Sequence, residues 1–244
     1  SQEEEWQVNE MKALLLNERG NQDEFLPIWY KLLKQYREAD KPEEVGKCLL
    51  TIASHFVMLE DYDNALPLYK EAYQLAVEHE FVDLQKSSGI MLVKYLCGAG
   101  DYSKSLEYYN KINPEIALVP SMQNEVVKSY MELNKPDSAR IYLAERLLLE
   151  GGDKIFLNCM MAETYIPEGQ EDSAFIFLDR AMESYKEKKK YYQGKDREVV
   201  LPGYFLSTCY LFADLLWKKG KVQQANQYYT FVEPLMKEVV RTPI

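Results

Sequence analysis

The chain has 244 residues, of which 47% are hydrophobic and 28% are charged. This composition is ordinary for a globular protein and supplies enough apolar residues for a sizeable core. The formal net charge of −10 disfavours nucleic acid as the main partner, because phosphate binding relies on clustered Lys and Arg. The longest apolar runs fall far short of the roughly 18 residues that cross a bilayer, so we expect no transmembrane segment.

Two stretches of the chain repeat one order of residue types 40 positions apart. Residues 61–76 read "DYDNALPLYKEAYQLA" and residues 101–112 read "DYSKSLEYYNKI". In both, Asp-Tyr precedes a small residue, which is followed by Leu and, four positions after the small residue, by Tyr. Offsets of four and seven lie on one face of a helix. Each stretch therefore predicts an amphipathic helix.

The same pattern recurs at six positions, each of which marks a predicted helix. In chain order they are Phe25, Ala65, Ser105, Ala139, Ala174 and Ala225. Apolar residues also stand nine and twelve positions before each of them, which predicts a preceding helix with its own apolar face. Small residues at the two facing positions allow close approach of the helices. Each unit is therefore expected to be a helix–turn–helix pair.

The predicted turn within each pair has its own signal. Five residues before the six marker positions stand Gly20, Glu60, Gly100, Asn134, Gly169 and Gly220. Gly, and less often Asn, accepts the left-handed backbone that ends a helix. In five of the six predicted pairs the first helix is therefore expected to end in this way, and the pair with Glu60 is the exception.

The predicted pairs fill a single domain, 1–244. Their approximate bounds are 6–40, 46–80, 86–113, 120–150, 155–190 and 206–240. Pro114 and Pro120 predict an early end to the helix before them and a hinge or kink in the array. Residues 186–204 predict a lengthened helix, a turn near Gly194 and a new start after Pro202.

The units resemble tetratricopeptide (TPR) repeats, which are helix–turn–helix pairs of about 34 residues. The second unit carries the resemblance best, with Ala53, Phe56, Ala65, Tyr69 and Ala72. The resemblance implies an all-α fold: an α-α superhelix, or right-handed solenoid, of about six TPR-like pairs. The 40-residue spacings predict helices about a turn and a half longer, as in divergent arrays of some bacterial regulators.

The sequence holds no recognised catalytic or phosphate-binding motif. Its two histidines, His55 and His79, have no evident partners, and its four cysteines include no C-x-x-C pair. We expect buried structural thiols, no catalytic residues, no metal site, no cofactor and no enzyme activity.

The family resemblance implies that the first helix of each pair lines a concave, partner-binding face. Projected onto this chain, that face comprises Asn17, Ser54, Met58, Lys94, Asn124, Lys128, Asn158, Glu163, Tyr210, Asp214 and Trp217. Lys94, Asn124 and Lys128 would form a cationic middle that holds a carboxylate. Tyr210 and Trp217 would offer flat apolar contacts.

Three functional classes stay open. The first is a non-catalytic scaffold for a protein or peptide partner. The second is a sensory or regulatory segment of a larger bacterial membrane-anchored signalling protein, such as a sensor kinase or transcription regulator. The third is an enzyme or small-molecule binder, which requires a deep pocket of perturbed carboxylates.

Two further expectations concern assembly and compartment. The last helix has an apolar stripe with no following unit, formed by Tyr229, Val232, Leu235, Met236 and Val239. It would allow self-association. The compartment is open between the cytoplasm and a periplasmic portion of a membrane-anchored protein.

Overall fold

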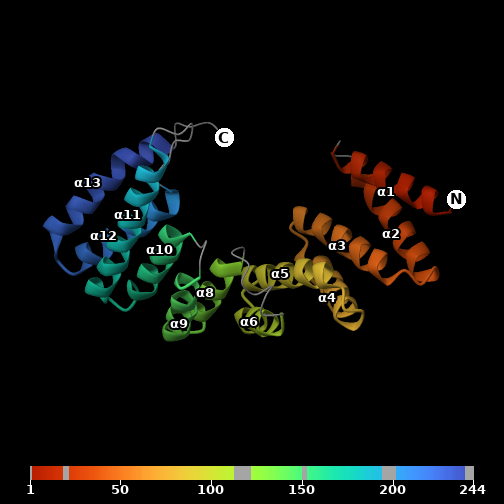
Figure 1. Ribbon diagram of the computed structural model, residues 1–244, viewed down its shortest axis with the longest axis horizontal. Coiled ribbons are helices and arrows are strands. Elements are labelled where there is room, and N and C mark those ends of the chain that lie inside the picture. The colour runs from red at the N-terminus through yellow and green to blue at the C-terminus, as the bar shows by residue number, and fades with distance from the viewer. Residues whose placement is uncertain (1, 19–21, 113–121, 150–152, 194–201, 240–244) are drawn as a thin grey trace. The chain divides into compact units, whose positions relative to one another are not determined.

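A computed structural model describes residues 2–18, 22–112, 122–149, 153–193 and 202–239 (Figure 1). Within these ranges the chain forms twelve helices and no strand. The helices are α1 (Gln2–Glu18), α2 (Gln22–Glu38), α3 (Pro42–Met58), α4 (Tyr62–Glu78), α5 (Val82–Gly98), α6 (Tyr102–Lys111), α8 (Gln123–Glu132), α9 (Pro136–Leu147), α10 (Lys154–Tyr165), α11 (Glu171–Tyr192), α12 (Gly203–Lys218) and α13 (Val222–Val239). The expected all-α fold of helix–turn–helix pairs is confirmed.

The helices form two compact units, divided between Ser129 and Tyr130 within α8. In the N-terminal unit α1 packs on α2, α3 on α4 and α5 on α6, and successive pairs pack on one another. In the C-terminal unit α9 packs on α10, and the pairs α10/α11 and α12/α13 pack together (Figure 1). We call α1, α3, α5, α8, α10 and α12 the first helices, and α2, α4, α6, α9, α11 and α13 the second helices.

Local sequence signals fix several helix starts. The Asp61 carboxylate accepts a hydrogen bond from the Asn64 backbone N–H at 3.2 Å, and Asp101 does the same for Lys104 at 3.3 Å. Asp153 caps α10 in the same manner. Such side chains satisfy backbone N–H groups that have no partner within the helix.

The predicted turns adopt left-handed backbone. Positive φ occurs at Gly100 (81°), Asn134 (56°), Gly169 (67°) and Gly220 (75°), which confirms four of the five predicted stops. Gly20 lies outside the described residues. Glu60 has a φ of 58°, so it departs from the pattern in residue type but not in conformation. Asp40 and Glu80, between pairs, also have positive φ, and no sequence signal predicted them.

Close approach of the two helices in a pair is visible at Ser105. Its hydroxyl donates a 2.8 Å hydrogen bond to the carbonyl oxygen of Val93, which lies twelve residues earlier in the preceding helix. Ser105 and Val93 are fully buried, as are Ala65 and Ala53 at the same positions in the helix pair α3/α4. Small or slender residues at these positions therefore let the helix backbones meet, as expected.

The bulky Phe25 at the first marker position packs against a histidine. Its ring lies face to face with that of His55 from α3, with centroids 4.6 Å apart and planes at 28°. Only 2% of His55 is exposed, and neither ring nitrogen has a hydrogen-bond partner among the described residues. Burial lowers the pKa of His55 below its usual 6.5, because a charged imidazole loses hydration in this core.

Helix lengths match the predicted breaks. The 17 residues of α3, and of α4, confirm the longer helices expected from the 40-residue spacings. In contrast, α6 has only 10 residues and ends before Pro114. The predicted hinge at Pro114–Pro120 lies outside the described residues. The expected lengthening of the helix at 186 is confirmed by the 22 residues of α11, and the predicted turn near Gly194 is outside the described ranges.

Each of the four cysteines lies in a first helix. Cys48, Cys97, Cys159 and Cys209 are buried thiols that form no disulfide with one another, as expected. Burial raises the pKa of both Cys48 and Cys209 to about 12. On the last helix Val232 is buried, but the side chains of Leu235, Met236 and Val239 lie outside the described residues, so self-association through this stripe stays a prediction.

Candidate partner-binding surfaces

In the N-terminal unit the structure places three predicted site residues on neighbouring first helices. Lys94 lies on α5, and Asn124 and Lys128 lie one turn apart on α8. The Cys97 thiol of α5 donates a weak 3.6 Å hydrogen bond to the Glu125 carbonyl oxygen, which joins the two helices beside these residues. Asn124 and Lys128 are exposed and Lys94 is partly exposed. The Lys128 ammonium lies 6.0 Å from the Tyr102 ring centroid, at the limit of a cation–π contact.

In the C-terminal unit three predicted residues form an exposed stripe on α12. Tyr210, Asp214 and Trp217 stand four and three residues apart, which places them on one helix face. Tyr210 is 45% exposed and Trp217 is 54% exposed. The hydroxyl of Tyr229 on α13 donates a hydrogen bond to the Asp214 carboxylate. Desolvation by burial and this hydrogen bond raise the Tyr229 pKa to about 12.

The Glu163 carboxylate lies on α10, facing α12. It accepts a 2.6 Å hydrogen bond from the Thr208 hydroxyl. Burial raises the pKa of Glu163, and the Thr208 hydrogen bond opposes that rise. Glu163 is therefore a partly buried acid at the contact between α10 and α12.

Asn158 does not lie on an exposed face of α10. Only 5% of the residue is exposed, and its side-chain amide donates a 2.7 Å hydrogen bond to the Lys154 carbonyl oxygen in its own helix. A position within a repeat does not specify which side of the helix its neighbours cover, and here the side chain is enclosed. The Asn158 side chain is therefore not accessible to a partner in the way that the sequence predicted.

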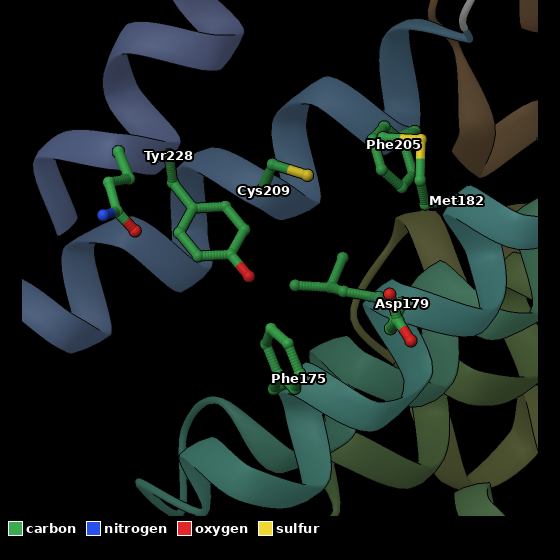
Figure 2. Close-up of a pocket in the computed structure, with 8 residues that line it drawn as sticks. Phe175, Asp179, Met182, Phe205, Cys209 and Tyr228 are labelled. Atoms are coloured by element: carbon green, nitrogen blue, oxygen red, sulfur yellow. The ribbon is translucent and has the colours of Figure 1, made fainter. Parts of the chain in front are cut away.

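The C-terminal unit also contains a groove that the sequence did not predict. It runs between α11 and α13 with α12 as its floor, and Figure 2 shows one half of it. Two hollows, of about 270 Å³ and about 280 Å³, share Phe175, Gln227 and Tyr228 in their walls. We call this surface the α11–α13 groove.

The floor of the groove is apolar. Phe205, Cys209, Phe212 and Leu216 of α12 are buried, and their spacing of four, three and four residues places them on one face. The Phe212 ring contacts Tyr228, with centroids 5.1 Å apart, and Phe175, with centroids 6.4 Å apart. An aromatic cluster thus stands where the hollows meet.

The rim of the groove is acidic along α11. Asp172 and Asp179 are exposed and seven residues apart, and Phe175 between them is 49% exposed. Figure 2 shows the Tyr228 hydroxyl pointing into the hollow. Burial, with smaller contributions from Cys209 and Asp179, raises the pKa of Tyr228 to about 12.

The side chains that line the groove include carboxylates but no histidine. Asp179 is the single carboxylate that lines the hollow of about 270 Å³. Within the described ranges, no three His, Cys, Asp or Glu side chains gather as metal ligands would. No helix in the same ranges combines the length and apolar content that a bilayer crossing requires.

Comparison with known proteins identifies the fold. No protein-family model matches the sequence, and no curated protein matches it. Solved structures do match, among them the apo form of RapI, with a TM-score of 0.63 and 13% sequence identity over 98% of this chain and 100% of that one. TPR-like repeats of a kinesin light chain from Podosopora anserina match with a TM-score of 0.37 and 14% identity over 89% and 97% of the two chains.

The helix pairs, their left-handed turns and the RapI likeness define the class: this is a TPR-type helical repeat fold. At 13% identity the likeness concerns the fold alone.

Proposed function

We propose that the protein is a non-catalytic scaffold that binds a protein or peptide partner through the exposed faces of its first helices. The stripe of Tyr210, Asp214 and Trp217 on α12 is the observation that supports this most directly. Large aromatic side chains left exposed on one helix face are the residues that most often dominate binding free energy. Because Tyr229 already holds Asp214 in place, less ordering is needed when a partner binds.

The N-terminal unit contributes positive charge, in contrast to the Asp214 carboxylate of the C-terminal unit. Lys94 and Lys128 are cations, and the exposed Asn124 carboxamide supplies further hydrogen-bond donors beside them. This combination suits a carboxylate or an acidic side chain of the partner. The predicted partner therefore carries an acidic segment for α5 and α8, and a segment with apolar or cationic side chains for α12.

The proposal of a non-catalytic role is supported by the state of the reactive side chains. The thiols of Cys48 and Cys209 are buried, and their pKa values are raised to about 12, so they are not thiolates at neutral pH. His55 is buried beneath Phe25. Their burial supports the proposal that these groups act as core residues and not as nucleophiles or general bases.

Affinity capture from a lysate of the source cell tests the proposal. Two variants remove the proposed contacts: Lys94→Ala with Asn124→Ala and Lys128→Ala, and Tyr210→Ala with Trp217→Ala. Loss of two exposed aromatic contacts is expected to reduce capture of the partner roughly tenfold or more. Circular dichroism checks that each variant is folded.

Matched controls carry the same kinds of substitution on second helices. Lys34→Ala with Lys70→Ala removes two exposed cations from α2 and α4. Ile141→Ala with Tyr191→Ala removes two side chains that are 64% and 66% exposed on α9 and α11. Partners captured equally by wild type and by both first-helix variants would refute the proposed surface.

A sensory or regulatory segment of a larger bacterial membrane-anchored signalling protein is the second candidate. The long 17-residue helices of α3 and α4, which resemble those of divergent regulator arrays, favour it. The reading frame that contains this sequence tests it: a membrane helix with a kinase or DNA-binding domain in the same frame supports this role, and their absence contradicts it.

A further inference from the structure

The α11–α13 groove and the exposed stripe of α12 are separate surfaces of the C-terminal unit. At 100° per residue, the floor residues Phe205, Cys209, Phe212 and Leu216 centre roughly 135° around the helix from Tyr210, Asp214 and Trp217. The groove is therefore not part of the first-helix face, and a ligand there leaves that face open.

Charge identifies the kind of ligand that suits the groove. At one end, Glu171 forms ion pairs with Lys219, at 3.6 Å, and with Lys221, so its charge is already balanced. Asp172 and Asp179 form no ion pair within the part of the chain that the structure describes. The rim thus presents two uncompensated carboxylates above an apolar floor, which favours a cationic ligand with apolar side chains.

The shape of the groove favours an extended peptide. From Asp172 to Met182 the α11 wall rises about 15 Å, which is the length of about five residues of extended chain. On the facing wall, Gln224 and Gln227 are exposed. A carboxamide both donates and accepts hydrogen bonds and so matches a peptide group. The Tyr228 hydroxyl, which points into the hollow, supplies one more donor.

We infer that the α11–α13 groove binds an extended segment of a partner protein in which two large apolar side chains alternate with Lys or Arg. Alternate side chains of an extended chain point the same way, so residues i and i+2 enter the two hollows and contact Phe175, Phe212 and Tyr228. The long cationic side chains between them reach back to Asp172 and Asp179 at the rim.

The test uses a peptide that carries fluorescein on its N-terminus, fluorescein-Lys-Leu-Lys-Phe-Lys-amide, and fluorescence polarisation with the full chain at low salt. We expect saturable binding. Asp172→Asn with Asp179→Asn should weaken it about fivefold or more, as expected for the loss of two exposed ion pairs. The matched variant Glu132→Gln with Glu145→Gln removes two exposed carboxylates of α8 and α9 and should bind as wild type does.

Two further measurements separate the groove from other apolar surfaces. Phe175→Ala, at a half-exposed position, should weaken binding without unfolding the unit. Tyr210→Ala with Trp217→Ala should leave peptide affinity unchanged. Peptide binding at the groove and partner binding at the first-helix face are therefore tested independently, and either proposal can be refuted while the other is supported.

The inference is overturned by any of three results. These are absence of saturable binding of the Lys peptide, equal binding of a peptide with Glu in place of each Lys, or wild-type affinity of the variant that carries both Asn substitutions.

Discussion

Replacing His55 by Phe should stabilise the N-terminal unit and remove much of its pH dependence between about pH 7 and 5. His55 is 2% exposed, and its ring stacks on Phe25 with centroids 4.6 Å apart. Phenylalanine keeps a ring in that place but has no nitrogen to desolvate. A buried polar group without a hydrogen bond costs about 1–3 kcal/mol, so we expect a gain of about 1 kcal/mol in the free energy of unfolding at pH 7.

The sign of the pH effect follows from the lowered pKa of His55. Burial holds the folded-state pKa below the usual 6.5, so the unfolded chain takes up the proton first as pH falls. The free energy of unfolding therefore decreases below about pH 6.5, by at most about 1.4 kcal/mol per pH unit for one proton. The decrease levels off once pH is below the folded-state pKa.

Tryptophan fluorescence during urea unfolding can follow this unit alone. The chain has three tryptophans, of which Trp6 and Trp29 are each 5% exposed in the N-terminal unit. In a Trp217→Phe background the signal therefore reports on that unit. Unfolding free energies measured at several values between about pH 5 and pH 7.5 give the slope for each variant.

His79→Phe is the matched control, because His79 is the other of two histidines and is exposed at the end of α4. It also stacks on an aromatic ring, that of Phe81, with centroids 5.4 Å apart. We expect this variant to keep the wild-type slope. Equal slopes in wild type and His55→Phe would refute the reasoning, since carboxylate titration is common to both proteins and cancels in the comparison.

Three further predictions concern stability. Burial raises the pKa of Glu163, so the contribution of this side chain to stability is present at acid pH and is lost as pH rises. Glu163→Gln should therefore stabilise the C-terminal unit by about 1 kcal/mol at pH 7. Thermal unfolding followed by Trp217 fluorescence measures this change. Glu60→Gly should raise the free energy of unfolding by about 0.5–1 kcal/mol, and Gly100→Ala should lower it by about 1 kcal/mol. Urea unfolding measures both changes, and the backbone argument is contradicted if Glu60→Gly destabilises the protein while Gly100→Ala stabilises it. Ser105→Ala should cost about 1 kcal/mol in the same assay, because the buried carbonyl in the preceding helix loses its donor.

The repeated pairs were predictable because their packing uses residue types with distinct patterns. Small residues such as Ala65 and Ser105 recur where helix backbones meet, and Gly or Asn recurs where the chain must adopt positive φ. Asp40 and Glu80 adopt the same backbone without such a residue type, so those turns had no signal. In them the packing of the flanking helices outweighs a local preference of about 1 kcal/mol.

The exposed residues of the first helices could be named from the sequence, because the repeat pattern assigns each position of a helix pair to one helix face. The stripe of Tyr210, Asp214 and Trp217 follows from projecting onto α12 the partner-binding face that the TPR resemblance implies. The α11–α13 groove depends on the separation of three helices, which no offset along the chain encodes. Even so, Asp172, Phe175 and Asp179 occupy one face of α11 beside the residues that pack against α12, and this pattern of acid, aromatic and acid was the available signal.

Because all four thiols are buried in first helices, their reactivity reports when the surrounding helices open. Two thiols belong to each unit, Cys48 and Cys97 to one and Cys159 and Cys209 to the other. An alkylating reagent reaches them only when a helix pair separates from its neighbours. Mass spectrometry of the labelled peptides would therefore time the opening of each unit in the unmodified protein, and a partner that binds one unit should slow labelling of that unit's two cysteines first.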